Sequence, residues 1–417
     1  MNRTVLALAI ATALAGCGSR EEGASGIHQG YSDTADQYEV DGVVVSNVDV
    51  RAKLWNPRGK SEEQITARVE YLASVYDVVR TEAQQQRAAE AREKYGEYIV
   101  INAMLPASVG IGGFTAENFE RAVRRNRDAG ITMVTGTVYA FPADGETTIL
   151  ERIAASTEVV RGLGLEIGDR TEAIRRANAE GTMVVMFNSQ GADYFIEEPE
   201  LLEQVRELGL QSSNFVYNSD NALAGGGTAQ ASGVTDLGKT FIERANAVGI
   251  VVDCSHSSNQ TCIDAASHST RPVIMTHSNS YGLHPVSRNV TDEAILAIAA
   301  SGGVICNTGV GLFLNEELDA SPEEYAKHVV YTADLIGRDR TCFSTDYVHN
   351  IYEYLLGFVG NVDIYPPERG FGGPTSNMGP EHVWDVVGIL EDQYGWSEQD
   401  IIGFLGENLM RVYEATW

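Results

Sequence analysis

From about residue 97 onward, short apolar runs alternate with helical segments, and this alternation limits the folds open to the chain. Helical patterns such as 115–130 and 290–302 separate most of the runs. The runs with the length and composition of strands are 98–105, 131–138, 182–187, 213–217, 249–254, 272–276, 302–307 and 341–345. Eight strands with intervening helices predict an α/β fold, a (β/α)8 barrel that spans residues 97–417. A doubly wound open sheet is the alternative, but no GxGxxG motif follows the first strand.

The residues before the barrel divide into three parts. Residues 1–17 carry one early arginine, a short apolar stretch and small residues before Cys17, which is the pattern of a signal peptide. Residues 18–59 begin with a stretch rich in Gly, Ser, Glu and Asp, and we interpret them as a tether and N-terminal extension. Residues 60–96 have apolar residues at helical spacing and predict a helix that packs against the barrel.

The end of the signal peptide resembles a bacterial lipobox. In the tetrapeptide 14-LAGC-17, Cys17 would be lipidated and become the first residue of the mature chain. No aspartate follows it to indicate retention in the inner membrane. We therefore expect a lipid-anchored protein of the bacterial cell envelope that faces the periplasm, with the outer membrane as the anchor site. The alternative is ordinary secretion with cleavage nearby.

Charge and cysteine spacing limit the partners and the metal patterns. The net charge of −28 argues against nucleic acid as a partner, because phosphate would be repelled. The remaining cysteines show no CxxC spacing, and we predict that they are buried small hydrophobic residues. They are Cys254, Cys262, Cys306 and Cys342. A disulfide in an oxidising compartment stays open as the alternative. The sequence also leaves the oligomeric state open between a monomer and a homodimer.

Polar residues stand at the ends of the predicted strands. They are Gln190, Tyr217, His256, His277, Asn307 and Asp346. A barrel gathers the carboxyl ends of its strands around one mouth, so these side chains are expected to converge. A single histidine at a strand end is more often structural, but two imidazoles and a carboxylate together favour a divalent-metal hydrolase.

Several segments from Tyr217 onward resemble the membrane (renal) dipeptidase family, zinc peptidases of the amidohydrolase superfamily. The segments are 249-GIVVDCSHSS-258, 272-PVIMTHSNSYGLHPVSRNVTDE-293, 302-GGVICN-307, 337-GRDRTCFSTDY-347 and 406-GENLMRVYE-414. Their order, spacing and strand context fit over some 200 residues, and the agreement is weaker from 98 to 216. The RN-x-x-D segment after the second histidine is specific, and the chain is identified as a divergent member of this family.

The resemblance implies a role for each matching residue. His256 and His277 fall where the family binds one of its two zinc ions, and Asp346 falls where a carboxylate handles the proton of the attacking water. Arg288 falls where a guanidinium group binds the terminal carboxylate of a dipeptide, a role suited to bidentate pairing. Tyr217 stands where many members have a histidine that contacts the scissile carbonyl. Tyr217 and Asn307 are therefore expected, with Arg288, to bind substrate.

Other positions depart from the family pattern. The first strand should end in a His-x-Asp pair, but 98-YIVINAMLPAS-108 offers only Asn102, Met104 and Pro106. An earlier 47-NVD-49 segment matches the pair but lies too far from the second strand. Gln190 stands where a bridging glutamate is expected, and its carbonyl can still donate a lone pair. Because two carboxylates are missing, the site suits one zinc ion or none.

Two hypotheses remain open. In the first, one zinc ion on His256, His277 and Gln190 activates water, Asp346 acts as base and then as acid, and a dipeptide or related small amide with a free carboxylate is hydrolysed. In the second, the scaffold has lost its hydrolytic metal site and binds a small carboxylate through Arg288. The presence of both histidines, Asp346 and Arg288 together favours the enzyme.

Overall fold

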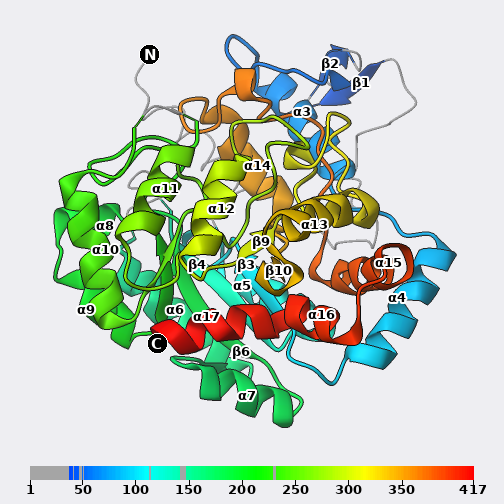
Figure 1. Ribbon diagram of the computed structural model, residues 1–417. Coiled ribbons are helices and arrows are strands. Elements are labelled where there is room, and N and C mark those ends of the chain that lie inside the picture. Colours follow the sequence, from blue (N-terminus) through cyan, green and yellow to red (C-terminus); the bar gives the residue numbers. More distant parts are fainter. Residues whose placement is uncertain are drawn as a thin grey trace.

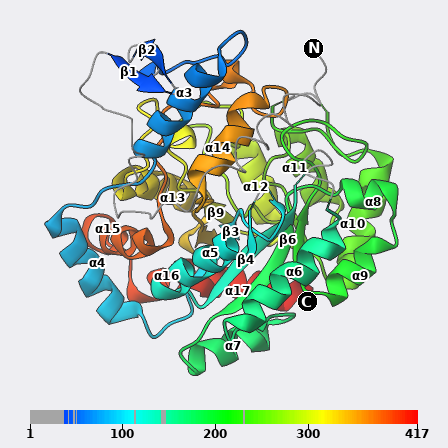
Figure 2. The same cartoon turned by 180° about the vertical axis from the view of Figure 1, so that it is seen from behind.

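The computed structural model describes residues 37–40, 42–46, 49, 51–111, 114–140, 147–228 and 232–417. Its centre is a curled parallel sheet surrounded by helices (Figures 1 and 2). The central strands are β3 (Ile101–Leu105), β4 (Met133–Tyr139), β6 (Val184–Ser189), β7 (Leu210–Asn214), β8 (Val251–Asp253), β9 (Ile305–Asn307) and β10 (Thr341–Phe343). The α/β barrel class expected from the sequence is confirmed.

The sheet follows the order of the chain. Strands β3, β4, β6, β7 and β8 pair in parallel, and β9 pairs with β10. Between them, the run predicted as a strand at 272–276 makes only single bridges, from Ile274 to Asp253 and from Met275 to Ile305. Side chains complete the circle between the first and last strands. Asn102 Oδ1 accepts from the backbone N–H of Thr345 at 3.1 Å, and Asn102 Nδ2 donates to Thr345 Oγ1 at 3.1 Å.

Helices follow most of the strands and cover the outside of the sheet (Figure 2). They are α5 (Ala116–Asp128), α6 (Ile149–Gly162), α7 (Thr171–Ala179), α8 (Asp193–Glu197), α9 (Leu201–Glu207), α10 (Asp236–Val248), α11 (Asn259–His268), α12 (Asp292–Ala300), α13 (Pro322–Ile336), α14 (Ile351–Gly360), α15 (Val383–Tyr394), α16 (Glu398–Ile402) and α17 (Asn408–Thr416). A short strand that was not expected, β5 (Glu166–Ile167), pairs with β6.

Packed side chains fill the interior of the barrel. One buried cluster joins residues of most central strands, among them Ile101, Val184 and Val251, to Leu409 and Tyr413 of α17. Helix α17 runs across the amino ends of the strands, where it covers this cluster (Figure 1). The interior is therefore closed at this end, and the opposite end is left for a site.

The strands begin or end a few residues away from the predicted runs. Strand β7 covers Leu210–Asn214 rather than 213–217, so Tyr217 lies in the loop beyond its end. Strand β6 extends to Ser189, so Gln190 follows it directly. Apolar content places a strand well, but its ends depend on pairing with neighbours that lie far away in the sequence.

The segment 60–96 is two helices rather than the single helix that was expected. Helix α3 (Glu62–Ser74) packs against α14, and α4 (Glu82–Tyr95) lies beside α15 (Figures 1 and 2). Thr81 caps α4 in a capping box with Gln84, a local signal that marks a new helix start. Before α3, β1 (Gln37–Val40) and β2 (Val43–Ser46) form an antiparallel hairpin within the expected tether.

All four barrel cysteines are buried, as predicted, and the disulfide that the sequence left open as the alternative joins two of them. Cys306 and Cys342 face each other on β9 and β10 and form a disulfide. Cys254 and Cys262 are free and buried, as predicted. The paired cysteines lie 36 residues apart in sequence, so only the pairing of the two strands brings them together.

The expected signal peptide and Cys17 lie outside the described residues. In the part of the chain that the structure describes, no helix is long and apolar enough to cross a membrane.

Candidate active site

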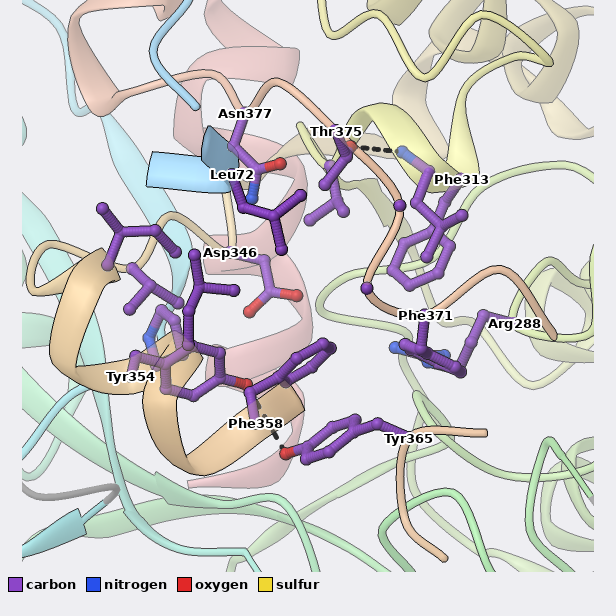
Figure 3. A pocket seen from close by; sticks show the side chains of 18 of the residues that line it. Leu72, Arg288, Phe313, Asp346, Tyr354, Phe358, Tyr365, Phe371, Thr375 and Asn377 are labelled. Atoms are coloured by element: carbon purple, nitrogen blue, oxygen red, sulfur yellow. Dashed lines mark hydrogen bonds between the residues drawn. The ribbon is translucent and has the colours of Figure 1, made fainter. Parts of the chain in front are cut away.

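A cavity of about 110 Å³ lies at the carboxyl ends of the strands. Gln190, Tyr217, His256, Arg288 and Asp346 all line it, so the structure brings these five predicted residues together. The cavity is also lined by Leu72, Tyr76, Pro106, Asn218, Val310, Leu312, Phe313, Val348, Ile351, Tyr354, Leu355, Phe358, Tyr365, Phe371, Gly372, Gly373, Thr375 and Asn377. Figure 3 shows part of this lining from close by.

His256 lines the cavity, and His277 is its neighbour. Both are buried, and their ring centroids lie 4.8 Å apart. His277 contacts His256 without lining the cavity itself. Burial lowers the pKa of both imidazoles well below the ordinary value, and the positive charge of Arg288 adds to the effect. Both rings are therefore neutral at physiological pH, which is the form that binds metal ions.

Hydrogen bonds orient both rings in the same way. His256 Nδ1 donates to Asn218 Oδ1 at 2.7 Å. The hydroxyl of Thr276 donates to Asp253, so its oxygen accepts from His277 Nδ1 at 2.7 Å. The Nε2 atom of each ring then carries the lone pair, and both Nε2 atoms are buried without a hydrogen-bond partner in the described part of the chain. Neither Asn218 nor the Asp253–Thr276 pair was singled out from the sequence.

The two unpaired Nε2 atoms fit a metal ion. Buried polar atoms without partners are rare, and a bound cation would satisfy both. The residues that the structure describes contain no group of three or more His, Cys, Asp or Glu side chains arranged to hold a metal. His256 and His277 could together hold one ion through these atoms, and the side-chain carbonyl of Gln190, which lines the same cavity, could be a further donor.

The end of the first strand offers no replacement for the missing ligands. Met104 Sδ accepts hydrogen bonds from Thr137 Oγ1 and Gln190 Nε2, each at 3.3 Å. Gln190 Nε2 also donates to Thr137 Oγ1 at 2.9 Å, so the amide nitrogen is used within the protein. Pro106 reaches the cavity but has no metal-binding atom in its side chain. Asp49, the other acidic candidate, is exposed and does not line the cavity.

Asp346 lies in the loop directly after β10 and faces the cavity. Burial raises the pKa of its carboxyl group to about 7, against the opposing effect of the positive charge on Arg288. A carboxylate with a pKa near the working pH can both accept and return a proton, as a general base requires. Its backbone has a φ of 57°, a left-handed conformation that costs about 1–3 kcal/mol and often occurs at functional sites.

Tyr76, in the turn between α3 and α4, supports the loop that carries Asp346. Its hydroxyl accepts hydrogen bonds from the backbone N–H of Val348 and from Asn377 Nδ2, both at 2.9 Å. These bonds tie the turn after α3, the Asp346 loop and the segment near residue 377 into one unit. Sequence reasoning did not find this residue, because the partners lie up to 301 residues away.

Arg288 lies across the cavity from Asp346 in the view of Figure 3. It is buried, and its guanidinium group stacks over the ring of Phe313 at 5.2 Å. Burial lowers the pKa of Arg288 below the ordinary value, and Asp346 opposes this effect. A buried guanidinium group presents its N–H groups in one planar fork, which suits a bidentate carboxylate ligand.

The other two predicted substrate-binding residues differ in their positions. Tyr217 stacks on His256 with ring centroids 4.2 Å apart, and its hydroxyl lies 2.9 Å from that of Tyr365. Asn307 does not line the cavity. Its amide group donates to Asn279 Oδ1 at 3.1 Å, so it supports the strand ends instead.

A glycine-rich loop covers the turns that carry Asn218 and His256. A Cβ atom at Gly226 would lie 2.1 Å from the backbone oxygen of Asn218, so only glycine fits this close approach. Asn218 and His256 themselves have φ values of 61° and 67°. The loop therefore holds two strained turns in place, at the point where the first histidine is oriented.

The raised pKa of Asp346 predicts a pH-dependent activity. A base must be ionised to accept a proton, so kcat/KM should rise about ten-fold per pH unit below pH 7 and level off above it. The two histidines do not contribute to this rise, because their pKa values lie well below 6.5. A pH–rate profile between pH 5 and 9 measures the effect, and a flat profile across pH 7 would contradict it.

Residues 115–359 match the family model described as membrane dipeptidase, peptidase family M19. An uncharacterized protein in the pqqA 5′ region of Klebsiella pneumoniae is 28% identical over 185 residues, which cover 42% of this chain and 68% of that protein. The family match runs from α5 to the last turn of α14, including both histidines, Arg288 and Asp346.

Solved structures have a similar fold. An amidohydrolase from Pseudomonas aeruginosa is 25% identical, with a TM-score of 0.68 over 79% of this chain and 99% of that one. A metallo peptidase from Rhodobacter sphaeroides, liganded with a phosphinate mimic of the dipeptide L-Ala-D-Ala, is 17% identical. Its TM-score is 0.58, over 77% of this chain and 99% of that one.

Proposed function

The chain belongs to the membrane dipeptidase family, and from this premise we propose that it hydrolyses the amide bond of a small substrate with a free carboxylate. One observation carries the proposal. One cavity is lined by a carboxyl group with a pKa of about 7, a buried guanidinium group and the imidazole of His256, and His277 packs against His256 with its own unpaired Nε2 atom.

His256 and His277 would hold one divalent ion, which we take to be zinc, with Gln190 as a further donor. When bound, such an ion lowers the pKa of a water molecule and polarises a carbonyl group. The protein supplies the remaining elements. Arg288 binds the substrate carboxylate, and this contact places the amide bond on the side of the cavity where Asp346 lies.

Asp346 moves the protons of the reaction. It takes a proton from the attacking water and then gives it to the nitrogen of the leaving amine, so the carboxyl group ends in its starting state. Tyr217 covers one face of His256 and limits the access of other water molecules. Tyr76 keeps the Asp346 loop in position through the bond to the backbone of Val348.

A second candidate function rests on the small ligand set. Two neutral histidines and a neutral amide are a weaker ligand set than the three histidine, carboxylate or thiolate ligands of most catalytic zinc sites. The chain would then be a binding protein for small carboxylates that uses the Arg288 side of the same cavity. Incubating the purified protein with a panel of small amides, with and without added zinc, separates the two functions. Release of an amino acid supports the enzyme, and binding without release supports the second candidate.

The ligand set predicts the metal stoichiometry. We expect at most one tightly bound divalent ion per chain, because Met104 and Pro106 replace the ligands of a second ion. Elemental analysis of the purified protein gives the count, and His256→Ala or His277→Ala should each remove the ion. His268 is paired with Glu243 outside the cavity, so His268→Ala is the matched control that keeps the metal. Two ions at full occupancy would contradict the assignment.

We also propose that Cys17 carries a lipid that anchors the protein in the cell envelope, facing the periplasm. The disulfide between Cys306 and Cys342 supports an oxidising compartment, where such bonds persist. Cell fractionation should find the protein with the outer membrane, and Cys17→Ala should release it into the soluble fraction. If the variant and the parent fractionate alike, the anchor assignment is wrong.

A further inference from the structure

The cavity carries little negative charge. Asp346 is the one carboxylate among the described residues that line it, and Arg288 is the one permanent cation. Gln190 is neutral, and His256 is neutral when its Nε2 atom binds a metal ion, because Nδ1 carries the proton that is donated to Asn218. With a divalent ion on the histidines, the lining carries a net positive charge. Such a cavity favours an anionic substrate over one with no net charge.

The rest of the lining is mostly aromatic or aliphatic. Ring centroids of Phe358 lie 3.9 Å from Tyr365 and 6.1 Å from Phe371, and Phe371 lies 6.3 Å from Phe313. These rings form a continuous aromatic wall that reaches Arg288 through Phe313. In Figure 3, Phe313 and Phe371 lie on the side of Arg288. A substrate whose carboxylate binds Arg288 therefore places its next side chain against aromatic rings.

Part of the cavity lining, including Tyr365 and Phe371 of the aromatic wall, comes from segments outside the range matched by the family model, 115–359. Leu72 and Tyr76 come from α3 and the turn after it, and Tyr365, Phe371 and Thr375 come from the segment after α14. The two segments are tied together. Arg68 Nη2 donates to the backbone oxygen of Gly372 at 2.6 Å, and the backbone N–H of Asn377 donates to the backbone oxygen of Tyr76 at 2.7 Å. The two segments, and the cavity lining that they carry, are thus a fixed part of the site.

We propose that the substrate is an N-acyl amino acid with a bulky apolar side chain, rather than a dipeptide with a free amino terminus. This inference rests on the proposed function, because it names the substrate of the same site. Hydrolysis breaks the bond between the acyl carbon and the nitrogen. The oxygen of water joins the acyl carbon, and the products are a carboxylic acid and a free amino acid.

The charge of the substrate decides between the two classes. An N-acyl amino acid carries one negative charge, which Arg288 binds, and its acyl group is neutral. A dipeptide carries in addition an ammonium group close to the scissile carbonyl. In the described lining Asp346 is the one carboxylate that can pair with that ammonium, and such a pair would compete with the role of Asp346 in moving protons. A divalent ion on the histidines and the guanidinium group of Arg288 would also repel the ammonium, so the dipeptide is expected to bind and react poorly.

Two nearly isosteric compounds test the proposal directly. N-acetylphenylalanine and glycylphenylalanine share the side chain, the carboxylate and the amide bond, and they differ by an ammonium group. Each compound is made with both stereoisomers of phenylalanine. For the stereoisomer that reacts faster, we expect kcat/KM of N-acetylphenylalanine to be at least about ten-fold higher than that of glycylphenylalanine. We expect a similar preference for N-acetylphenylalanine over N-acetylalanine, because filling an apolar pocket discriminates by about 10–200-fold.

The aromatic wall is tested by variants of one residue. Phe371→Ala should bring the ratio between N-acetylphenylalanine and N-acetylalanine close to one, and Phe371→Leu should give an intermediate ratio with less risk to folding. Tyr281 is exposed and does not line the cavity, so Tyr281→Ala is the matched control and should keep the original ratio. An unchanged ratio in Phe371→Ala would overturn the role of the wall.

A binding measurement separates failure of this inference from failure of the proposed function. Calorimetry with the Asp346→Asn variant reports the affinity of both compounds without turnover. If glycylphenylalanine is cleaved or bound as well as N-acetylphenylalanine, the substrate inference is wrong and the hydrolase stands. If the parent chain cleaves neither compound with added zinc, the proposed hydrolase function is wrong. A preference for the N-acetyl compound in binding would then still support the recognition that we propose.

Discussion

Replacing Asp346 with asparagine is expected to lower kcat by about 10²–10⁴-fold, the usual contribution of a general acid–base group. Asparagine has nearly the same shape as aspartate but does not take up a proton in this range of pH. Ligand affinity should stay within a few fold, because Arg288 provides the main contact with the carboxylate. Steady-state kinetics and calorimetry on the same preparation give the two numbers.

A buried aspartate outside the cavity provides the control for this prediction. Asp385 is fully buried in α15, pairs with Arg80 at 3.3 Å, and burial raises the pKa of its carboxyl group to about 6. Asp385→Asn should therefore change stability but leave kcat close to the parent value. If both variants lose activity equally, the loss reflects disturbed packing and the assignment of Asp346 as the base is wrong.

Replacing Arg288 is expected to have the next largest effect. Arg288→Met should lower kcat/KM by about 10²–10³-fold, because truncating one partner of a buried charge pair costs about 2–5 kcal/mol. Arg288→Lys should give an intermediate loss, because an ammonium group cannot form the two parallel hydrogen bonds of a guanidinium group. Kinetics on a substrate with a free carboxylate and on its amidated form show whether the loss depends on that carboxylate.

The amidated substrate decides what Arg288 does. It has no carboxylate, so the parent enzyme and both variants should treat it alike. Equal losses on the two substrates would show that Arg288 only holds its loop in place. Arg338 stacks over Trp396 at 5.2 Å, the same distance as Arg288 over Phe313, but it does not line the cavity. Arg338→Lys is therefore the matched control.

The barrel and most of the candidate site could be predicted from local sequence. Apolar runs of strand length give the positions of the central strands, and the polar residues that follow them lie at one end of any such barrel. Gln190, Tyr217, His256 and Asp346 reach the cavity for this reason. Asn307 also ends a strand, but a hydrogen bond to Asn279 takes up its amide group. The position of a residue along a strand thus indicates at which end of the barrel the residue lies, but it does not indicate which group the side chain contacts.

Only the tertiary structure shows how the site is oriented and closed. The tautomer of His256 depends on Asn218, which lies 38 residues away in the sequence. The tautomer of His277 depends on Thr276, whose hydroxyl is oriented by Asp253, 23 residues away. The disulfide depends on the pairing of β9 with β10. The wall of the cavity depends on contacts such as Arg68 with Gly372, across 304 residues.

The sequence by itself therefore determined the class of fold, the family and the residues that can do chemistry. These features are local, because strand periodicity and short motifs are formed by residues that lie close together in the sequence. The tertiary structure decided which atoms of those residues are free, how many metal ligands meet, and which side chains enclose the substrate. Those features depend on contacts between distant segments, and such contacts form only when the whole chain packs into one structure.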